Sequence, residues 1–416
     1  MKLQIKAFAL RRWLAGALAT RNTMRPRTGI ILALAIFSLS YGVRSLHAVD
    51  LAPIMYTAAQ PFSGLTVGYD KKAALILEGG GVLGPYNIAP SETEWISRSP
   101  GYSAYLSVIY AALGRNFFTV QAVQNGLNSI SPVLIFLIAG QLISWRVGIA
   151  SGLLAAVSHH MGYISNFILP DSLCALPVLA AMLFLIKAQR LRRRAYWFYA
   201  LAGLMIGISA WLRSQAMLMG LFILIVLTLI SERRMKAITQ KAVMAAVSLL
   251  VIAPITIKNY VVYGEFVPIN IGMGIVLLEG IGESSEGRFG APVTDLEVAE
   301  QEAILYGNPE YAGSWSTPDG IMRDRDRVKR SLDIIAGHPV WYAGAMLGRM
   351  ARMVKYSADA ELVHTGVAPD PDQKSEPARR EWRRLDQNSS PLILGRSFGW
   401  MRPLARAAQR AAKETL

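Results

Sequence analysis

Residues 197–230 read WFYALAGLMIGISAWLRSQAMLMGLFILIVLTLI, and Arg213 is the single charged residue in this stretch. A transmembrane helix needs about 20 mainly apolar residues, within a range of ~17–25. The runs on either side of Arg213–Gln215 approach that length, and the polar segment between them fits a turn at a membrane surface. Basic clusters flank the pair, at Lys187–Arg194 and at Glu232–Lys241. The stretch therefore predicts a membrane-spanning helical hairpin.

The composition of the whole chain supports the same class. Of 416 residues, 53% are hydrophobic and 17% are charged, whereas soluble domains carry about 25% charged residues. The net charge of +15 could suggest nucleic acid, but the basic residues lie in short clusters between apolar runs and in the tail. That distribution is typical of loops next to anionic lipid, so we expect membrane lipids and no nucleic acid as partners. With Cys174 as the single cysteine, no intrachain disulfide can form.

Hydropathy predicts an all-α polytopic membrane protein with a bundle of about seven or eight transmembrane helices. The last apolar stretch, His338–Val354, contains Arg349 and Arg352, so it could be an eighth span or an interfacial helix. The other predicted spans are Gly29–Leu46, Val120–Ser144, Val147–Gly162, Ser172–Ile186, Trp197–Leu212, Ala216–Ile230 and Ala242–Ile257.

The positions of Lys and Arg orient these spans, because cytoplasmic loops carry an excess of both. Residues 1–28 form a basic N-terminus that we expect in the cytoplasm. Residues 29–355 then form the transmembrane domain, with two long extracytoplasmic loops at about 47–119 and 258–335. Residues 356–416 form a basic, polar C-terminal tail. Loops as long as the two at about 47–119 and 258–335 are usually functional when they fold. Both loops contain aromatic and amphipathic stretches.

Charged residues at the predicted extracytoplasmic ends of spans are the candidates for chemistry. Asp70 could deprotonate a hydroxyl as a general base, or it could be an acid favoured at a helix start. Asp171, after Pro170, could serve as an N-cap and in catalysis as well. Arg213 and Lys258 could snorkel to the interface or bind a lipid phosphate.

Two further patterns are weaker as functional signals. The adjacent His159 and His160 point to different helix faces, so we expect them to line a polar cavity rather than to bind metal. Residues 74–84, ALILEGGGVLG, look like the oxyanion loop of patatin-like lipases. These enzymes need a G-x-S-x-G elbow, and residues 101–105, GYSAY, lack its final glycine. We therefore expect the glycines to end a helix and turn the loop.

The order of several short motifs resembles a known superfamily. Arg98–Tyr102, followed by Tyr110–Gly114, looks like an R-x-P-G-Y-P segment and its following Y-x-x-x-G. Phe167–Leu173 is similar to a second-loop acidic motif before a span. In Ala210–Gln215, Ser214 stands for the proline of an L-x-R-P turn.

The later part of the chain continues the pattern. Pro254–Pro268 is similar to P-W-x-x-R-N-Y…G…V-P, with Ile255 for Trp and Lys258 for Arg. Ile334–Tyr342 resembles I-x-x-H-P-x-x-Y. The chain thus resembles the GT-C glycosyltransferases, in particular the dolichyl-phosphate-mannose-protein mannosyltransferases and the rhizobial lipopolysaccharide sugar transferases.

This resemblance implies a GT-C-like bundle in a bacterial inner membrane with an extracytoplasmic active site. The donor would be a polyprenyl-phosphate sugar, and the acceptor a lipid, a glycan or a protein of the envelope. Asp70 is the best match to the family's catalytic base, although the family's acid comes a turn earlier, near Leu65. Asp50 is the alternative base.

The resemblance also implies roles for the remaining candidates. Arg213, Lys258 and Asn259 would bind the donor phosphate, while Asp171, Tyr69 and Arg98 would orient the donor. No cofactor is indicated, and a divalent cation remains open. Two rival interpretations remain: a transporter or flippase of lipid-linked saccharides, and an inactive, truncated scaffold of the same family.

Overall fold

The computed structural model describes residues 24–57, 64–191, 195–229 and 234–354. Every regular element in these ranges is a helix, so the predicted all-α fold is confirmed. Five stretches are long and apolar enough to cross a membrane, which marks an integral membrane protein. They are Pro26–Leu51, Phe117–Leu142, Pro170–Arg190, Ala195–Leu212 and Ile238–Tyr263. The predicted tail and most of the predicted N-terminal segment lie outside the described residues.

The chain divides into two compact units. Among the described residues, unit 1 comprises 24–57, 64–71 and 109–191. Its described helices are α2 (Pro26–Thr57), most of α3 (Gly64–Leu75), α5 (Phe117–Asn128), α6 (Ile130–Leu142), α7 (Trp145–Ala156), α8 (His159–Ile164) and α9 (Pro170–Arg190).

Close backbone packing holds the helices of unit 1 together. Gly148 of α7 lies against Phe136 and Gly140 of α6, where a Cβ on Gly148 would come within 2.9 Å of the Gly140 backbone. Ile36, Phe136 and Ala156 form an apolar cluster that joins α2, α6 and α7. Small residues allow this approach because association in lipid relies on van der Waals packing.

The predicted span Val147–Gly162 is interrupted in the structure. Helix α7 ends at Ala156, and the side chain of Ser158 then accepts a hydrogen bond from the Met161 amide to cap the short helix α8. A serine at this position competes with a continuous helix because its hydroxyl caps the next one. Helix α7 is therefore shorter than the five candidate spans. The segment Ser214–Leu229, which corresponds to the predicted span Ala216–Ile230, is also a shorter apolar helix.

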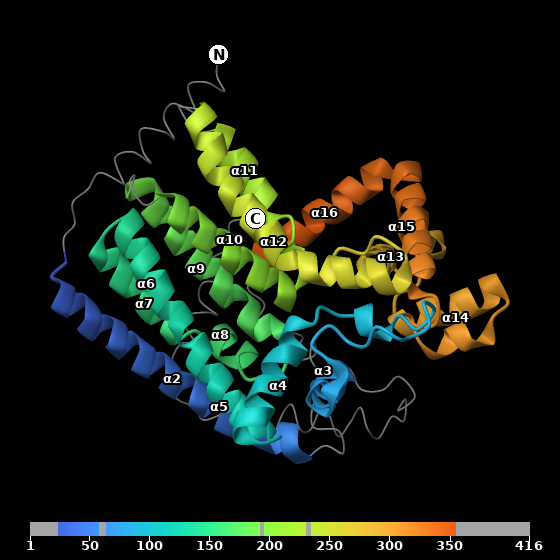
Figure 1. The fold of residues 1–416 in the computed structure, drawn as a ribbon, viewed down its shortest axis with the longest axis horizontal. Coiled ribbons are helices and arrows are strands. Elements are labelled where there is room, and N and C mark those ends of the chain that lie inside the picture. Colours follow the sequence, from blue (N-terminus) through green and yellow to red (C-terminus); the bar gives the residue numbers. More distant parts are fainter. Residues whose placement is uncertain (1–23, 58–63, 192–194, 230–233, 355–416) are drawn as a thin grey trace, which may run out of the picture. The chain divides into compact units, whose positions relative to one another are not determined.

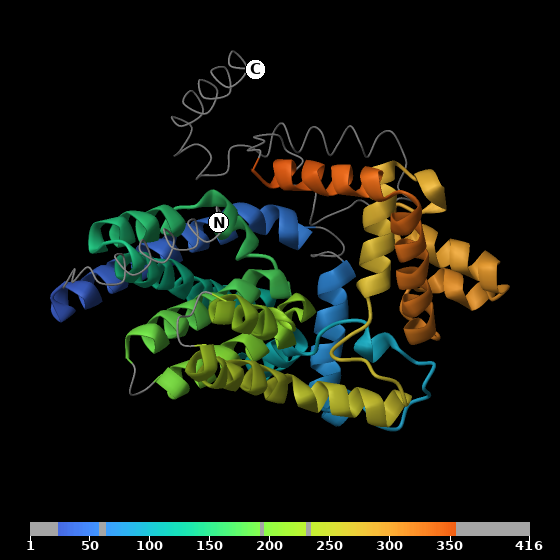
Figure 2. The same cartoon turned by 90° about the horizontal axis from the view of Figure 1, so that it is seen from above.

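Unit 2 consists of Lys72–Val108 and Arg193–Ser357. Its apolar helices are α10 (Ala195–Leu212), α11 (Met219–Leu229) and α12 (Arg234–Tyr263), and α4 (Gly101–Leu113) begins in this unit. Helices α10 and α12 run side by side in both views (Figure 1 and Figure 2). A Cβ on Gly207 of α10 would come within 2.7 Å of the Val251 side chain, which explains how closely the two helices pack.

The second predicted loop is a folded helical region rather than a connector. It contains α13 (Met273–Ser285), α14 (Asp295–Tyr306) and α15 (Gly320–Gly337). The stretch His338–Val354, predicted as an eighth span or an interfacial helix, forms α16 (Pro339–Val354), which is not among the five candidate spans of the described residues. Arg323 and Arg327 of α15 are fully buried, and both pair with the buried Glu302 of α14. Asp324 accepts hydrogen bonds from the Gly272 and Gly274 amides at 3.1 and 2.9 Å, which satisfies the start of α13.

Candidate active site

Asp70 lies in the last part of α3 that belongs to unit 1, and both of its carboxylate oxygens have partners. Tyr110 donates its hydroxyl to Oδ1 at 2.8 Å, and Arg115 Nε donates to the same oxygen at 3.1 Å. Arg115 Nη2 donates to Oδ2. The Asp70 side chain is 12% exposed and that of Arg115 is 56% exposed. The carboxylate therefore lies at the edge of the unit 1 interior, where it is oriented by a phenol and a guanidinium.

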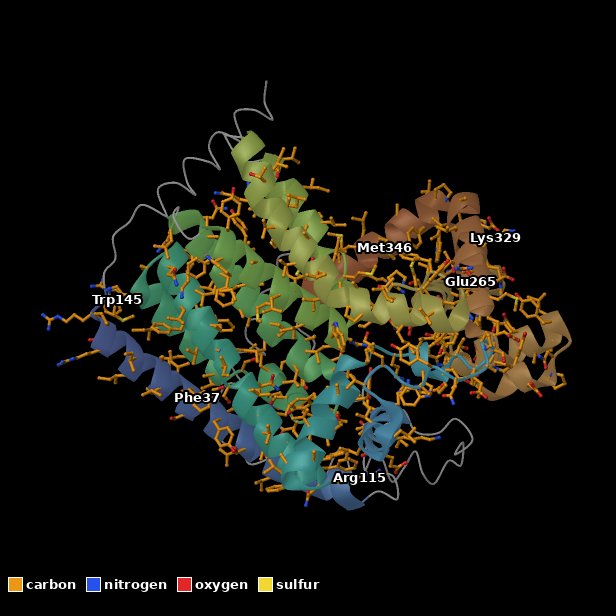
Figure 3. All side chains as sticks on the ribbon, in the orientation of Figure 1. Phe37, Arg115, Trp145, Glu265, Lys329 and Met346 are labelled. Carbon is orange, nitrogen blue, oxygen red and sulfur yellow. The ribbon has the colours of Figure 1, made fainter. Side chains whose placement is uncertain are left out.

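Burial, and the hydrogen bond to the Asp70 carboxylate, raise the pKa of the Tyr110 phenol. Tyr110 consequently stays protonated and donates at neutral pH. Arg115 precedes α5 in the chain, and Figure 3 labels its side chain there. A carboxylate held by these two donors is fixed in direction, which a base that accepts a proton from a bound hydroxyl requires.

A hydrogen bond from Thr66 also fixes the helix that carries Asp70. Thr66, one turn before Asp70 on α3, donates its hydroxyl to the carbonyl of Ile168 at 3.1 Å. Gln121 and Gln124 of α5 hold the same loop by donating to the carbonyls of Asn166 and Phe167, at 2.8 and 2.7 Å. The loop before α9 thus anchors α3.

Asp171 follows that loop, but it is not the N-cap. Helix α9 begins at Pro170, its N-cap is Leu169, and no side chain caps it. Proline at the first helical position has no amide to satisfy, and its fixed φ starts the helix two residues earlier than predicted. Asp171 therefore lies exposed in the first turn, where the helix dipole favours an acid. Tyr69, another predicted donor-orienting residue, is buried.

Unit 2 contains a fully buried cation, Lys258. Its side chain is 1% exposed, and its Nζ has no hydrogen-bond partner among the described residues. The nearest stabilising group is the ring of Tyr263, whose centroid lies 5.3 Å from Nζ. We expected Lys258 to end a span, but α12 continues to Tyr263. The lysine is therefore enclosed, and its ammonium group offers all three donors to an anion.

Lys72 is another buried cation of unit 2. Its Nζ donates to the Glu94 carbonyl at 2.7 Å and to Ser97 Oγ at 3.2 Å. Burial lowers the pKa of Lys72 to about 8; Glu94 opposes this shift, and the positive charges of Arg98 and Lys258 add to it. The positive charges of Arg98 and Lys258 thus lie close enough to act on Lys72. Such a cluster is stabilised when an anion neutralises it.

Arg213 lies beside the same segment of chain. It follows α10, and the backbone of Trp211, two residues earlier, lies against Gly101, where a Cβ would come within 2.6 Å of the Trp211 carbonyl oxygen. Gly101 is the glycine of the R-x-P-G-Y-like motif, so this motif brings the start of α4 against the end of α10. Arg98 lies three residues before Gly101, where α4 begins, and all of these residues belong to unit 2.

Asn259 has a structural role in the motif Pro254–Pro268. Its amide nitrogen donates to the carbonyls of Val267 and Ile269, each at 3.0 Å. Thr256 donates to the Pro268 carbonyl at 2.6 Å, and Gly264 ends the helix with a φ of 68°. The motif therefore folds the chain back along α12. Since both amide hydrogens of Asn259 are used, its predicted contact with the donor phosphate stays a prediction.

The histidines and the glycine run lie in different parts of the chain: His159 and His160 are exposed in α8, and their role in lining a polar cavity stays a prediction. Groups of three or more potential metal-binding side chains are absent from the described residues, and the His159 ring packs against His47. Helix α3 ends at Leu75, and Gly79, Gly81 and Gly84 all have positive φ values. The prediction that these glycines turn the loop is confirmed.

Three residues in these arrangements were missing from our sequence-based site: Tyr110, Arg115 and Lys72. Tyr110 was noted only as part of a motif, and nothing in the local sequence connects Arg115 with an acid 45 residues earlier. Lys72 had a signal that could have been used, because it lies two residues from Asp70 in a short helix of mixed polarity. Their partners become apparent only in the folded units.

The apolar helices define the class of the protein, an integral membrane protein, and comparison with known proteins narrows it. Residues 97–257 match the family model described as dolichyl-phosphate-mannose-protein mannosyltransferase. No curated protein and no solved structure shows significant similarity to the chain. The matched range includes Arg98, Asp171 and Arg213, and it ends one residue before Lys258. The predicted resemblance is confirmed over this range, and it indicates a membrane glycosyltransferase.

Proposed function

We propose that the protein transfers a sugar from a polyprenyl-phosphate donor to a hydroxyl group of an envelope lipid, glycan or protein. The observation that carries this proposal is the buried, unpartnered ammonium group of Lys258. The proposal places the reaction on the extracytoplasmic face of a bacterial inner membrane, as the distribution of basic loops suggests.

In this reaction the acceptor oxygen forms a bond to the anomeric carbon of the sugar. The bond from that carbon to the phosphate oxygen breaks, and its electron pair leaves with the polyprenyl phosphate. Asp70 takes the proton of the acceptor hydroxyl. Its hydrogen bond from Tyr110 supports this role because it directs the carboxylate. Arg115 would have to release one oxygen of Asp70 before the proton can be accepted.

The leaving phosphate gains a negative charge as the bond breaks. Cations already fixed around it stabilise that charge without reorganisation. We assign this role to Lys258 and Arg213. We add Lys72 because its Nζ is held by Ser97, next to Arg98 in the chain, and because the positive charges of Arg98 and Lys258 act on it. Arg98, Tyr69 and Asp171 would orient the donor, and Asn259 would act on the phosphate through the fold of its loop.

The experiment is sugar transfer by the purified full chain in liposomes that contain a labelled polyprenyl-phosphate sugar and a candidate acceptor. Asp70→Asn keeps the shape of the side chain and removes its charge, so we expect transfer to be lost and donor binding to remain. Asp50→Asn is the matched control and should retain transfer. Full activity of Asp70→Asn would refute the assignment of the base, and loss in Asp50→Asn alone would move it to Asp50.

The same preparation separates the enzyme from a transporter or an inactive scaffold. A glycosyltransferase consumes the donor and yields a glycosylated acceptor together with polyprenyl phosphate. A flippase would move the intact donor between leaflets, and a scaffold would do neither. Donor movement without transfer would therefore contradict the proposal.

A further inference from the structure

Unit 1 contains a group of buried polar side chains that the proposed reaction does not use. The group lies around Arg44 on α2, in the stretch Pro26–Leu51 that is apolar enough to cross a membrane. Its members come from α2, from α5 and from the loop after α8, and each is at most 4% exposed: Ser40, Arg44, His47, Asn125, Asn128 and Asn166.

Arg44 has no counter-ion in the part of the chain that the structure describes. Its side chain is 1% exposed, and no carboxylate of the described residues pairs with it. Arg44 Nη1 donates to the Ser40 carbonyl at 3.3 Å and to Ser40 Oγ, and Nε has no partner among the described residues. An ionisable residue inside a membrane span is costly and usually functional. The free Nε of this buried guanidinium therefore indicates that an anion binds there.

A purely structural role explains Arg44 poorly. Both side-chain partners belong to Ser40, one turn earlier on the same helix, so the guanidinium connects no two elements. The connection between helices is made instead by the backbone: the Arg44 carbonyl accepts from Asn125 Nδ2 at 3.5 Å and from Asn166 Nδ2 at 3.2 Å. Replacement of the side chain would leave that connection in place.

Neighbouring polar atoms also lack partners. His47 Nδ1, Asn125 Oδ1 and Asn128 Nδ2 are all buried without a hydrogen bond in the described part of the chain. More than 90% of buried polar groups in proteins are normally paired. Asn125 is tied to Arg44 directly, and Asn128 lies one turn further along α5. Unmet polar atoms thus occur on residues of α2 and α5 that adjoin the Arg44 segment of the chain.

We propose that Arg44 and Asn128 form an anion site in unit 1 that binds the phosphate group of an anionic phospholipid. A phosphate diester accepts two parallel hydrogen bonds from a guanidinium, and an amide nitrogen adds another donor. Arg44 lies two turns before Leu51, where the candidate span ends, which is about 10 Å along a helix of ~1.5 Å rise per residue. Local thinning of the bilayer brings lipid head groups toward a charged side chain at such a depth.

The test measures the thermal stability of the full chain in nanodiscs. The wild type is compared in phosphatidylcholine, in phosphatidylcholine with phosphatidylglycerol, and in phosphatidylcholine with added sodium phosphate. A bound ligand stabilises the folded state, so we expect phosphatidylglycerol to raise the midpoint of unfolding by several degrees. Arg44→Met should lose this rise. Arg146→Gln, an exposed arginine of the same unit, should keep it.

Further outcomes keep the test decisive. A rise with sodium phosphate equal to that with phosphatidylglycerol would overturn the lipid as ligand and leave a site for free phosphate. The site itself is refuted if the wild type shows no rise, or if Arg44→Met shows the same rise as the wild type. If Arg44→Met does not fold, Arg44→Lys is tested in its place. Lysine keeps the charge but lacks the two parallel N–H donors of the guanidinium, so this variant should retain less than half of the rise in the midpoint of unfolding. A full rise in Arg44→Lys would contradict recognition by the guanidinium.

Discussion

Replacement of Lys258 by methionine should make the protein more stable and less active. The wild-type ammonium group is 1% exposed and has no hydrogen-bond partner among the described residues. Burial of an ion costs several kcal/mol even after relaxation. The contact with the Tyr263 ring at 5.3 Å returns only about 0.5–2 kcal/mol. Since methionine fills a similar volume, we expect the free energy of unfolding to rise by about 1–3 kcal/mol.

Donor binding should change in the opposite direction. Loss of one partner from a buried charge pair costs about 2–5 kcal/mol. At about 1.4 kcal/mol per tenfold change, Lys258→Met should therefore lower kcat/KM for the donor by roughly 30-fold or more. The two assays are thermal unfolding of the purified protein without donor, and initial rates of sugar transfer at varied donor concentration.

Lys241 provides the matched control on the same helix. It is also buried, but its Nζ donates to the Leu227 carbonyl at 2.6 Å. Lys241→Met leaves that carbonyl without a partner, so it should lower stability by about 1 kcal/mol and leave kcat/KM unchanged. Our interpretation of Lys258 is refuted if Lys258→Met lowers stability as Lys241→Met does while kcat/KM for the donor stays at the wild-type value.

Three other predictions follow from the described contacts. Tyr110→Phe removes a hydrogen bond to the Asp70 carboxylate, worth about 1.5–3 kcal/mol; kcat should fall while KM for the donor stays constant, and a change in KM alone would contradict this. Because burial lowers the pKa of Lys72 to about 8, its charge is lost above that pH, so KM for the donor should rise from pH 7 to pH 9. Lys72→Arg should lessen the rise; an unchanged pH profile in that variant would exclude Lys72. Burial, Asp295 and Glu283 raise the pKa of Glu279 to about 7. A raised carboxyl pKa stabilises the fold below the unfolded value and loses that contribution as the pH rises through the folded value. Glu279→Gln should therefore unfold at a higher temperature than the wild type at pH 8, and this difference should shrink as the pH is lowered below the unfolded value; equal midpoints at pH 8 would contradict the shift.

The apolar segments were predictable because a membrane requires long apolar helices whatever their neighbours are. The predicted spans Ser172–Ile186 and Trp197–Leu212 fall inside α9 and α10. The ends of the helices were harder to predict, because hydropathy carries no information about helix capping. Ser158 divides one predicted span, and α12 continues beyond Ile257 because Asn259 and Gly264, rather than the end of the apolar run, decide where the chain turns.

The candidate site was predictable as a set of residue types and not as a set of contacts. A lysine at the end of an apolar run and an acid in the first long loop are visible in the sequence, and the motifs around Gly101 and Asn259 were recognised. The partners were not predictable, because they depend on which side chains the fold brings together. Arg115 pairs with Asp70 across 45 residues, and Arg44 is enclosed by residues of α5 that lie far from it in sequence.

The central claim is that this membrane protein transfers a sugar from a lipid-linked donor. The most direct measurement is the release of polyprenyl phosphate by the purified full chain, supplied with a labelled polyprenyl-phosphate sugar and an envelope acceptor fraction. We predict release in step with glycosylation of the acceptor, and loss of both in Asp70→Asn and in Lys258→Met. Intact donor after prolonged incubation with wild-type protein, in liposomes where the donor is shown to bind, would contradict the claim.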